Sequence, residues 1–376
     1  MRTTDDLSRF CCLNSDRPEY GKRGSGNLTV PHRSGPDKSK RILRCRTCKA
    51  RFSERKGTPL FDARLPPAKV ESVLEHVAEG CGVRQTGRLC RVAANTVARS
   101  SRLAGEHAKA AHDELVAISP RTTEVQFDEK WTFVAKKEAN CARSDPADDH
   151  KGDHWDHVAL DAPHRLVLCV VPGTRTVENT EALVDDTRRR TEGRLLSLMT
   201  SDNDPPYESA ILQGYGEPVT PPRTGKPGRP LASYQAPPQG LVYAVVEKTR
   251  AKGRVVRVGT RVVFGRMAAV ALALAMSPVS RPIDTAFIER KNGADRHRNA
   301  RKARKSYRFS KDWRHHEAAK SLCLSSYNFC WGVRTLTIQD EKGDRHRRSP
   351  AMAAGRTDHL WSMAEWLSRP AVVQRS

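Results

Sequence analysis

The sequence predicts a mixed α/β protein in which one large domain follows two smaller N-terminal segments. Three observations predict it: residues 1–60 lack helical periodicity, residues 66–118 have it, and residues 122–336 alternate between strand-like and helical runs. A chain of 376 residues is long enough for two or three domains with at least one sizeable core. Residues 337–376 are polar and basic, and we expect a C-terminal tail with one amphipathic turn or two in HLWSMAEWL.

The first segment is expected to resemble a zinc ribbon, because it carries cysteines at a metal-binding spacing. In RCRTCKARFS two residues separate Cys45 from Cys48, and thiolates at this spacing can share one tetrahedral zinc ion. Upstream, FCCLN contains Cys11 and Cys12, but adjacent cysteines do not easily chelate the same ion. The alternative is a ribbon that binds no metal. The candidate zinc ligands are Cys12, Cys45 and Cys48, with His32 or Asp16 to complete the set.

Residues 66–118 are expected to form a helix-turn-helix DNA-binding domain. Apolar residues recur at helical spacing from Val70 to Val77, and Gly80 and Gly82 mark the break before the next helix. The last helix, VAANTVARSSR, would be the recognition helix. The alternative is an ordinary three-helix bundle that does not touch DNA. The expected DNA contacts in this domain are Arg91, Asn95, Thr96 and Arg99.

The large domain, residues 122–336, begins with a strand-rich unit. We expect strands in TEVQFDEKWTFVAKK, HWDHVALDA, RLVLCVVPG and LLSLMTSD, and a helix in VENTEALVDDTRRRT. Residues 203–265 are expected to be an insertion that combines a Pro- and Gly-rich surface excursion with a pair of strands. The apolar run MAAVALALAM, residues 267–276, is too short to span a bilayer and is expected to be a buried helix.

The charge of the chain predicts a polyanionic partner. The net charge is +23, and the stretch from Arg290 to Arg314 contains eleven Lys or Arg residues and only two acids. Nucleic acid is the commonest partner of so basic a protein. The N-terminus has no apolar signal sequence, and the ten cysteines fit a reducing compartment. We therefore expect a cytoplasmic protein that binds DNA and has no membrane segment.

Three carboxylates stand where a metal site would need them. Asp128 lies in the middle of an apolar strand, Asp202 ends another strand, and Glu289 lies near the start of the helix that leads into the basic stretch. An RNase H-like fold, a mixed sheet flanked by helices, brings acids from such positions together. Convergent oxygens can bind two Mg²⁺ or Mn²⁺ ions, which clamp the attacking and leaving oxygens of phosphoryl transfer.

Each of these acids also has an ordinary interpretation. Asp128 could pair with a neighbouring lysine, Asp202 could cap a turn, and Glu289 could pair with Arg290. Jointly, in this order and on these elements, a metal site is the better interpretation. The rival acids for the three positions are Glu129, Asp161 and Asp204.

Several motifs together resemble a known family. FDEKW, TSDNDPPY, IERKNG followed by DRHRNARKARKSYRFSKDW, and SSYNFCWGVRTL are similar to motifs of the DDE transposases of the insertion sequence 1 family. The resemblance extends from the N-terminal ribbon to about residue 336. Two departures matter: Arg17 stands near the place of a second ribbon cysteine, and Glu289 comes 87 positions after Asp202, a longer spacing than in the smallest members.

The resemblance implies a transposase with Asp128, Asp202 and Glu289 as its acidic triad. Water would attack the phosphodiester at the end of the element, and the released 3′-OH would then attack the target DNA. The ribbon and the helix-turn-helix would recognise the terminal inverted repeats, and, by analogy, a homodimer or larger assembly would form on DNA. The residues after Glu289 that would contact DNA are Lys291, Asn292, Arg296, Arg298, Arg301 and Lys305.

Other functions remain open at this level. A DNA-binding regulator would use the ribbon and the helix-turn-helix alone, and its binding would survive loss of the three acids. An RNase H-like nuclease or Holliday-junction resolvase would use the same acids without strand transfer. A decayed transposase is a third alternative, because the cysteine set of the ribbon is incomplete.

Overall fold

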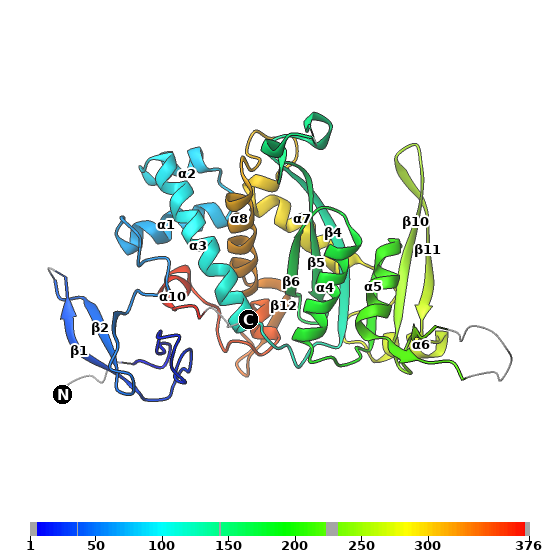
Figure 1. Ribbon diagram of the computed structural model, residues 1–376, viewed down its shortest axis with the longest axis horizontal. Helices are drawn as coiled ribbons and strands as arrows, with labels where there is room; N and C mark the ends of the chain where they lie inside the picture. Colours follow the sequence, from blue (N-terminus) through cyan, green and yellow to red (C-terminus); the bar gives the residue numbers. More distant parts are fainter. Residues whose placement is uncertain (1–5, 36, 143, 223–231, 373–376) are drawn as a thin grey trace.

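The computed structural model describes residues 6–35, 37–142, 144–222 and 232–372. Figure 1 shows a small sheet and three helices at one end of the molecule and a long hairpin at the other. A larger sheet with helices on both faces lies between them.

The central sheet has six strands in the order β11-β10-β7-β4-β5-β6. β4 pairs with β7 in parallel and β7 with β10 in parallel, whereas β5, β6 and β11 each run antiparallel to a neighbour. This mixed sheet, flanked by helices, fits an RNase H-like fold and confirms the predicted α/β class. The strands are β4 (Glu124–Val134), β5 (Gly152–Asp161), β6 (Leu166–Gly173), β7 (Leu198–Asp202), β10 (Tyr243–Ala251) and β11 (Arg254–Phe264).

Helices cover both faces of this sheet, and β4, β5 and β7 in its middle are largely buried, whereas most of β11 is exposed. Phe127 of β4 and Tyr243 of β10 pack in the main core, which includes Tyr207 of α5 (Pro205–Tyr215). On the other face Ile288 and Leu324 pack against the outer strands. The remaining flanking helices are α4 (Val177–Arg190), α7 (Ala286–Arg298) and α8 (Trp313–Ser325).

The N-terminal sheet and the following helices have small cores of their own. Strands β1 (Leu28–Ser34), β2 (Lys40–Cys45) and β3 (Arg51–Ser53) form an antiparallel sheet over Phe10, Leu43 and Phe52. Its neighbours in the chain are the helices α1 (Pro67–Ala78), α2 (Val83–Cys90) and α3 (Ala94–Leu115), which bury Val73, Cys90 and Val97 between them.

Helix α3 crosses α8 at very short range. A Cβ atom added to Gly105 would lie 2.1 Å from the carbonyl oxygen of Ala318, so no larger residue fits without moving the helices apart. This close crossing joins the three N-terminal helices to the central domain, and Figure 1 shows α3 and α8 side by side.

The apolar helix expected to be buried is exposed, and that prediction is wrong. Helix α6 (Met267–Met276) buries Val270, whereas Met267 is 68% exposed and Leu272 is 61% exposed. The helix packs through one side only, on a small cluster with Leu198 and Val242. Among the described residues, no helix combines the length and the apolar character needed to cross a bilayer.

The segment expected to be a tail is folded onto the body of the molecule. It forms β12 (Val333–Gln339), β13 (Arg345–Arg348), α9 (Pro350–Ala353) and α10 (Met363–Ser368). The side chain of Trp366 is 2% exposed and packs edge-on against His107 of α3 at a ring distance of 4.9 Å. The buried apolar residues of this C-terminal segment, among them Trp361 and Trp366, therefore belong to the main core.

A few short elements complete the structure. Part of the predicted insertion forms a two-stranded sheet of β8 (Glu217–Val219) and β9 (Tyr234–Ala236), while its residues 223–231 lie outside the described residues. The remaining turns are the 3-10 helices Glu138–Asn140, Pro146–Asp148 and Ala300–Lys302 and the π-helical turn Ser326–Cys330.

Candidate active site

Two of the three predicted acids lie on adjacent parallel strands, at the level where β7 ends. Phe127 of β4 is level with Ser201 of β7, and Asp128 and Asp202 each follow by one residue. Because successive side chains point to opposite faces of a sheet, both carboxylates share the face that α7 covers. The amide Nδ2 of Asn292 on α7 donates to Asp128 Oδ2 at 2.7 Å.

The third acid comes from the first turn of α7. The Thr285 hydroxyl, at the N-cap of that helix, lies 3.0 Å from Glu289 Oε1 and 3.2 Å from Asp202 Oδ1. The acidic side chain is favourably placed near the positive end of the helix dipole. The structure therefore brings Glu289 to the strand end that holds Asp202.

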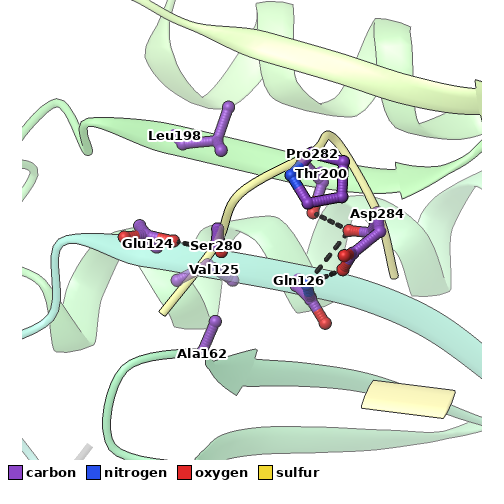
Figure 2. Close-up of a pocket in the computed structure, with 9 residues that line it drawn as sticks. All are labelled: Glu124, Val125, Gln126, Ala162, Leu198, Thr200, Ser280, Pro282 and Asp284. Atoms are coloured by element: carbon purple, nitrogen blue, oxygen red, sulfur yellow. Dashed lines mark hydrogen bonds between the residues drawn. The ribbon is translucent and has the colours of Figure 1, made fainter. Parts of the chain in front are cut away.

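Polar contacts from β4 and β7 hold the start of helix α7 in place. The side-chain oxygen of Gln126 accepts from the backbone N–H of Ile288 at 3.0 Å, and its Nε2 donates to the Asp284 carbonyl at 3.0 Å. Thr200 donates to the same carbonyl at 3.1 Å. Figure 2 shows Gln126 and Thr200 converging on Asp284 from β4 and β7. These bonds fix the start of α7 relative to both acid-bearing strands.

A lysine that the sequence analysis missed completes the group. Lys248 Nζ lies 2.8 Å and 2.9 Å from the two carboxylate oxygens of Asp202, and it also forms an ion pair with Glu289. Partial burial disfavours the charged amine, but the hydrogen bonds to the two carboxylates outweigh it and raise the pKa of Lys248. Val246 of β10 is level with Asp202, so only the register of the sheet reveals Lys248 as a neighbour.

Asp128 is the most buried member of the triad. Burial raises the pKa of its carboxyl, and the nearby charges of Asp202 and Glu289 act in the same direction, while the Asn292 hydrogen bond opposes them. Burial is therefore the main reason that the ionised form of Asp128 is disfavoured.

The donor set fits a hard divalent cation. Carboxylate oxygens are the ligands that Mg²⁺ and Mn²⁺ prefer, and a cation, the Lys248 ammonium, already lies between Asp202 and Glu289. In this arrangement the ammonium takes the place that an ion held by both carboxylates would need. Metal binding at the triad therefore requires Lys248 to move.

The rival acids have other partners. Glu129 points to the opposite face, where its carboxylate lies 3.5 Å from Arg175, and Asp204 lies 3.1 Å from the same guanidinium. Burial raises the pKa of Glu129 to about 7. Asp161 is fully buried and accepts from the Thr122 hydroxyl at 2.6 Å. None of the three joins the group around Lys248.

Two of the residues expected to contact DNA after Glu289 are buried, namely Asn292, which is 2% exposed and donates to Asp128, and Lys291. Lys291 was expected to neutralise phosphates, but its side chain is 7% exposed and packs over the Tyr327 ring at 4.5 Å. Together with Lys130 and Lys302 it belongs to a buried charge network around Asp156 and Asp295. In this arrangement the Lys291 ammonium is not accessible to a ligand.

The other expected contacts after Glu289 differ in exposure. Arg298 pairs with Glu79 and lies 3.9 Å above the Trp331 ring, so it joins α7 to α1. Arg296 and Arg301 are partly exposed, and Lys305 is exposed. The surface that can meet DNA is thus smaller than the basic stretch suggests.

Most of the expected contacts in the N-terminal helices are accessible. Arg91 and Asn95 are exposed around the turn between α2 and α3, and Thr96 is partly exposed. Arg99 is partly exposed but donates to the backbone oxygen of Asp62 at 2.8 Å.

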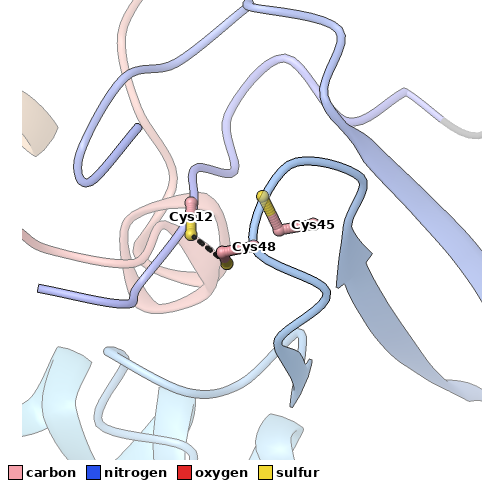
Figure 3. Close-up of side chains that lie close together, drawn as sticks. All are labelled: Cys12, Cys45 and Cys48. Carbon is pink, nitrogen blue, oxygen red and sulfur yellow. Dashed lines mark hydrogen bonds between the residues drawn. The ribbon is translucent and has the colours of Figure 1, made fainter. Parts of the chain in front are cut away.

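Three of the predicted cysteine ligands lie together. The sulfur atoms of Cys12, Cys45 and Cys48 are all within 4.8 Å of one another. Figure 3 shows the three side chains converging from the N-terminal loop and the turn after β2. Burial raises the pKa of the Cys12 thiol to about 12, whereas the backbone N–H of Ala50 lowers the pKa of Cys48. Three convergent sulfurs fit zinc. Among the described residues neither His32 nor Asp16 joins this group, so the expected fourth ligand is not found.

Comparisons with known proteins are limited. Neither a protein-family model nor a curated protein matches the sequence. Solved structures that match include the Mos1 strand transfer complex, at 14% identity, and Mos1 paired-end complexes with the left transposon end and with Mn, each at 16%; the TM-score is 0.17 for all three. The matches cover 40% of this chain and 54% to 56% of those chains, so this chain spans just over half of their length. A likeness of this size assigns neither a family nor an activity.

Proposed function

We propose that the chain is a DDE-type DNA transposase that cleaves at the terminal inverted repeats of an insertion sequence and joins the 3′ ends to target DNA. The observation that carries the proposal is the meeting of Asp128, Asp202 and Glu289 at one edge of the sheet. The Lys248 ammonium lies between Asp202 and Glu289, and Asp128 lies on the same face of the sheet. Acids in these positions could hold the divalent ions of a phosphoryl-transfer site.

The roles of the side chains follow from their contacts. Asp128, Asp202 and Glu289 would hold Mg²⁺ or Mn²⁺. When bound there, these ions supply charge stabilisation for the attacking and leaving oxygens of phosphoryl transfer. Asn292 orients Asp128, and the Thr285 hydroxyl holds Asp202 and Glu289 together. Lys248, once released, would be left beside the scissile phosphate with its charge available.

The N-terminal modules would recognise the DNA ends. The helices α1 to α3 would act as a helix-turn-helix, with Arg91, Asn95 and Thr96 toward the duplex. The three-stranded sheet would act as a zinc ribbon around Cys12, Cys45 and Cys48. Two copies would be needed to bring two ends together, so we propose a homodimer on DNA.

The test uses DNA that flanks the gene in its own genome, incubated with Mg²⁺ or Mn²⁺. Wild type is compared with Glu289→Gln and with Glu341→Gln, a control at an exposed position far along the chain. We expect nicking and strand joining for wild type and for the control, and neither for Glu289→Gln. Nicking without joining would indicate a nuclease or resolvase. Sequence-selective binding without cleavage in any of the three proteins would indicate a regulator or a decayed enzyme.

A further inference from the structure

The hairpin of β10 and β11 extends beyond the rest of the sheet as a free two-stranded ribbon. Figure 1 shows it standing clear of the neighbouring helices. Every residue from 249 to 258, on both strands and in the turn, is exposed. Below this level β10 is buried, with Val245 and Val246 under 5% exposed, and β11 ends at the buried Phe264. The free part of the ribbon, residues 249–258, contributes nothing to the core. Packing of the core therefore does not explain why the hairpin extends this far.

The ribbon is strongly cationic. From Thr249 to Arg266 the chain has six Lys or Arg residues and no Asp or Glu. Four of them, Arg250, Lys252, Arg254 and Arg257, lie in the exposed part. Unpaired cations at this density attract a polyanion.

Exposed valines lie among these charges. Val255 is 44% exposed, Val256 62% and Val258 61%. A two-stranded ribbon has the width of a DNA groove, and apolar side chains flanked by arginines contact sugars and base edges there. Val256 and Val258 share one face of β11 and Val255 lies on the other, so both faces offer apolar contacts among the charges, as a ribbon inserted into a groove of duplex DNA would use.

The reach of the ribbon can be measured from the active site. Val246 is level with Asp202, and Ala251, the last residue of β10, lies five residues further along the strand. At about 3.4 Å per residue, the tip is about 17 Å from the carboxylates. This distance corresponds to roughly half a helical turn, or about five base pairs, of duplex.

The ribbon lies on the opposite side of the active site from the N-terminal modules. In Figure 1 the helices α1 to α3 stand at one end of the molecule, the acid-bearing elements β4 and α7 in the middle, and the ribbon at the other end. If the N-terminal modules hold the end of the element, DNA that passes the carboxylates and continues must next meet the ribbon.

We propose that the β10–β11 ribbon is an arm that binds the duplex on the far side of the scissile phosphodiester, about five base pairs from it. The inference rests on the proposed function, because that function defines where the duplex is cut. Before cleavage this duplex is the flanking DNA of the donor, and after joining it is the target.

The experiment compares three full-length proteins: wild type, the ribbon variant Arg250→Ala/Arg254→Ala/Arg257→Ala, and the control Lys342→Ala/Arg345→Ala/Arg347→Ala. The control removes the same charge from exposed residues around the β12–β13 turn. Three duplexes are used: an end with 20 added base pairs of flank, the same end cut flush, and the end joined to unrelated target DNA. Affinity against salt and a hydroxyl-radical footprint are measured in Ca²⁺, and nicking is measured in Mg²⁺.

We expect the ribbon variant to lose affinity for the flanked and the target-joined duplexes and to match wild type on the flush end. For three lost phosphate contacts, the slope of log affinity against log salt should flatten by about 2.7. Protection centred about five base pairs beyond the cut should disappear. The control should keep the salt slope and the footprint of wild type. Melting curves should show that all three proteins are folded.

Several results would overturn the inference. One is equal loss on all three duplexes, and another is the same loss in the control, since either would indicate a general charge effect. A third is an unchanged footprint with a changed oligomeric state in sedimentation, which would make the ribbon a protein interface. The two proposals can fail separately: wild type that protects the flank without nicking would refute the transposase only, and nicking with an unprotected flank would refute the arm only.

Discussion

The ammonium of Lys248, a residue of β10, lies within 2.9 Å of both carboxylate oxygens of Asp202, so the strand next to β7 supplies this acid with a counter-ion. Thr285 and Glu289 lie in the same group. Two clustered carboxylates would repel each other without a cation. Lys248 thus offsets the repulsion between Asp202 and Glu289, and it would compete with a divalent ion at the proposed site.

Replacing Lys248 with Met should therefore strengthen divalent-metal binding. We expect Lys248→Met to bind Mn²⁺ about tenfold more tightly, which corresponds to about 1.4 kcal/mol and to the loss of a partly exposed charged contact. Titration calorimetry and the Mn²⁺-induced rise in Tm would measure it. Lys342→Met, at an exposed turn, is the control. Equal Mn²⁺ affinity in wild type and Lys248→Met would show that the ammonium does not compete with the metal.

The buried charge network should be sensitive to the loss of one acid. Asp156 is 1% exposed and pairs with Lys130 and Lys302, which are also buried. Asp156→Asn leaves both ammonium groups short of a partner and should lower the free energy of unfolding by about 3–5 kcal/mol. Urea denaturation would measure the change, with Asp62→Ala at an exposed position as the control. A loss below about 1 kcal/mol, the range of a surface pair, would contradict the network's role.

The stability of the protein should fall in mild acid partly through His107. Burial lowers the pKa of this imidazole to about 4, and the charges of Glu114 and Arg23 act on it in opposite directions. Because the unfolded pKa is about 6.5, the unfolded chain binds the proton first, and the contribution of His107 is complete above that value and lost as the pH falls toward 4.

Between pH 7 and pH 5 this single group should cost wild type about 2 kcal/mol of unfolding free energy. His107→Leu should therefore lose less stability than wild type over that interval, whatever its stability at pH 7. Urea denaturation at the two pH values would show the difference. Parallel losses in the two proteins would mean that His107 titrates normally in the folded state.

The three clustered thiols should bind zinc through protein sulfur alone. We expect wild type to hold about one zinc ion per chain and Cys48→Ser to lose it, because two thiolates hold the ion poorly. Metal analysis after dialysis would measure the content, and Cys81→Ser, outside the cluster, is the control. Metal-free wild type that melts at the same temperature as zinc-loaded protein would mean that the small sheet does not need the ion.

Much of the fold could be predicted because strands and helices leave local signatures. Alternation in FDEKW indicates β4, and the apolar run that ends at Asp202 indicates β7. An acid inside a strand is expensive, so Asp128 is conspicuous. Glu289 stands at the head of a helix that the sequence also indicates. Whether these acids act in catalysis stays a prediction.

What could not be predicted depends on contacts between distant segments. Lys248 becomes a site residue only through the pairing of β10 with β7, and Lys291 is buried only because α7 packs against Tyr327. The helix α6 is apolar on all sides, so its sequence contains no pattern that would have predicted its exposure. Trp366 lies in a short apolar run between polar residues. It is buried because it packs against α3, which is distant in the sequence.

The packing of the C-terminal segment also sets an order of events during synthesis. Residues 361–367 complete the core beneath α3, and the backbone N–H of Val372 donates to Glu114 at 3.1 Å. During synthesis, the three N-terminal helices therefore cannot complete their packing until these late residues have been made, some 250 residues after the helices themselves. The module proposed to recognise DNA reaches its final packing only after the triad has been translated, which favours the finished chain over the nascent one as the form that engages DNA.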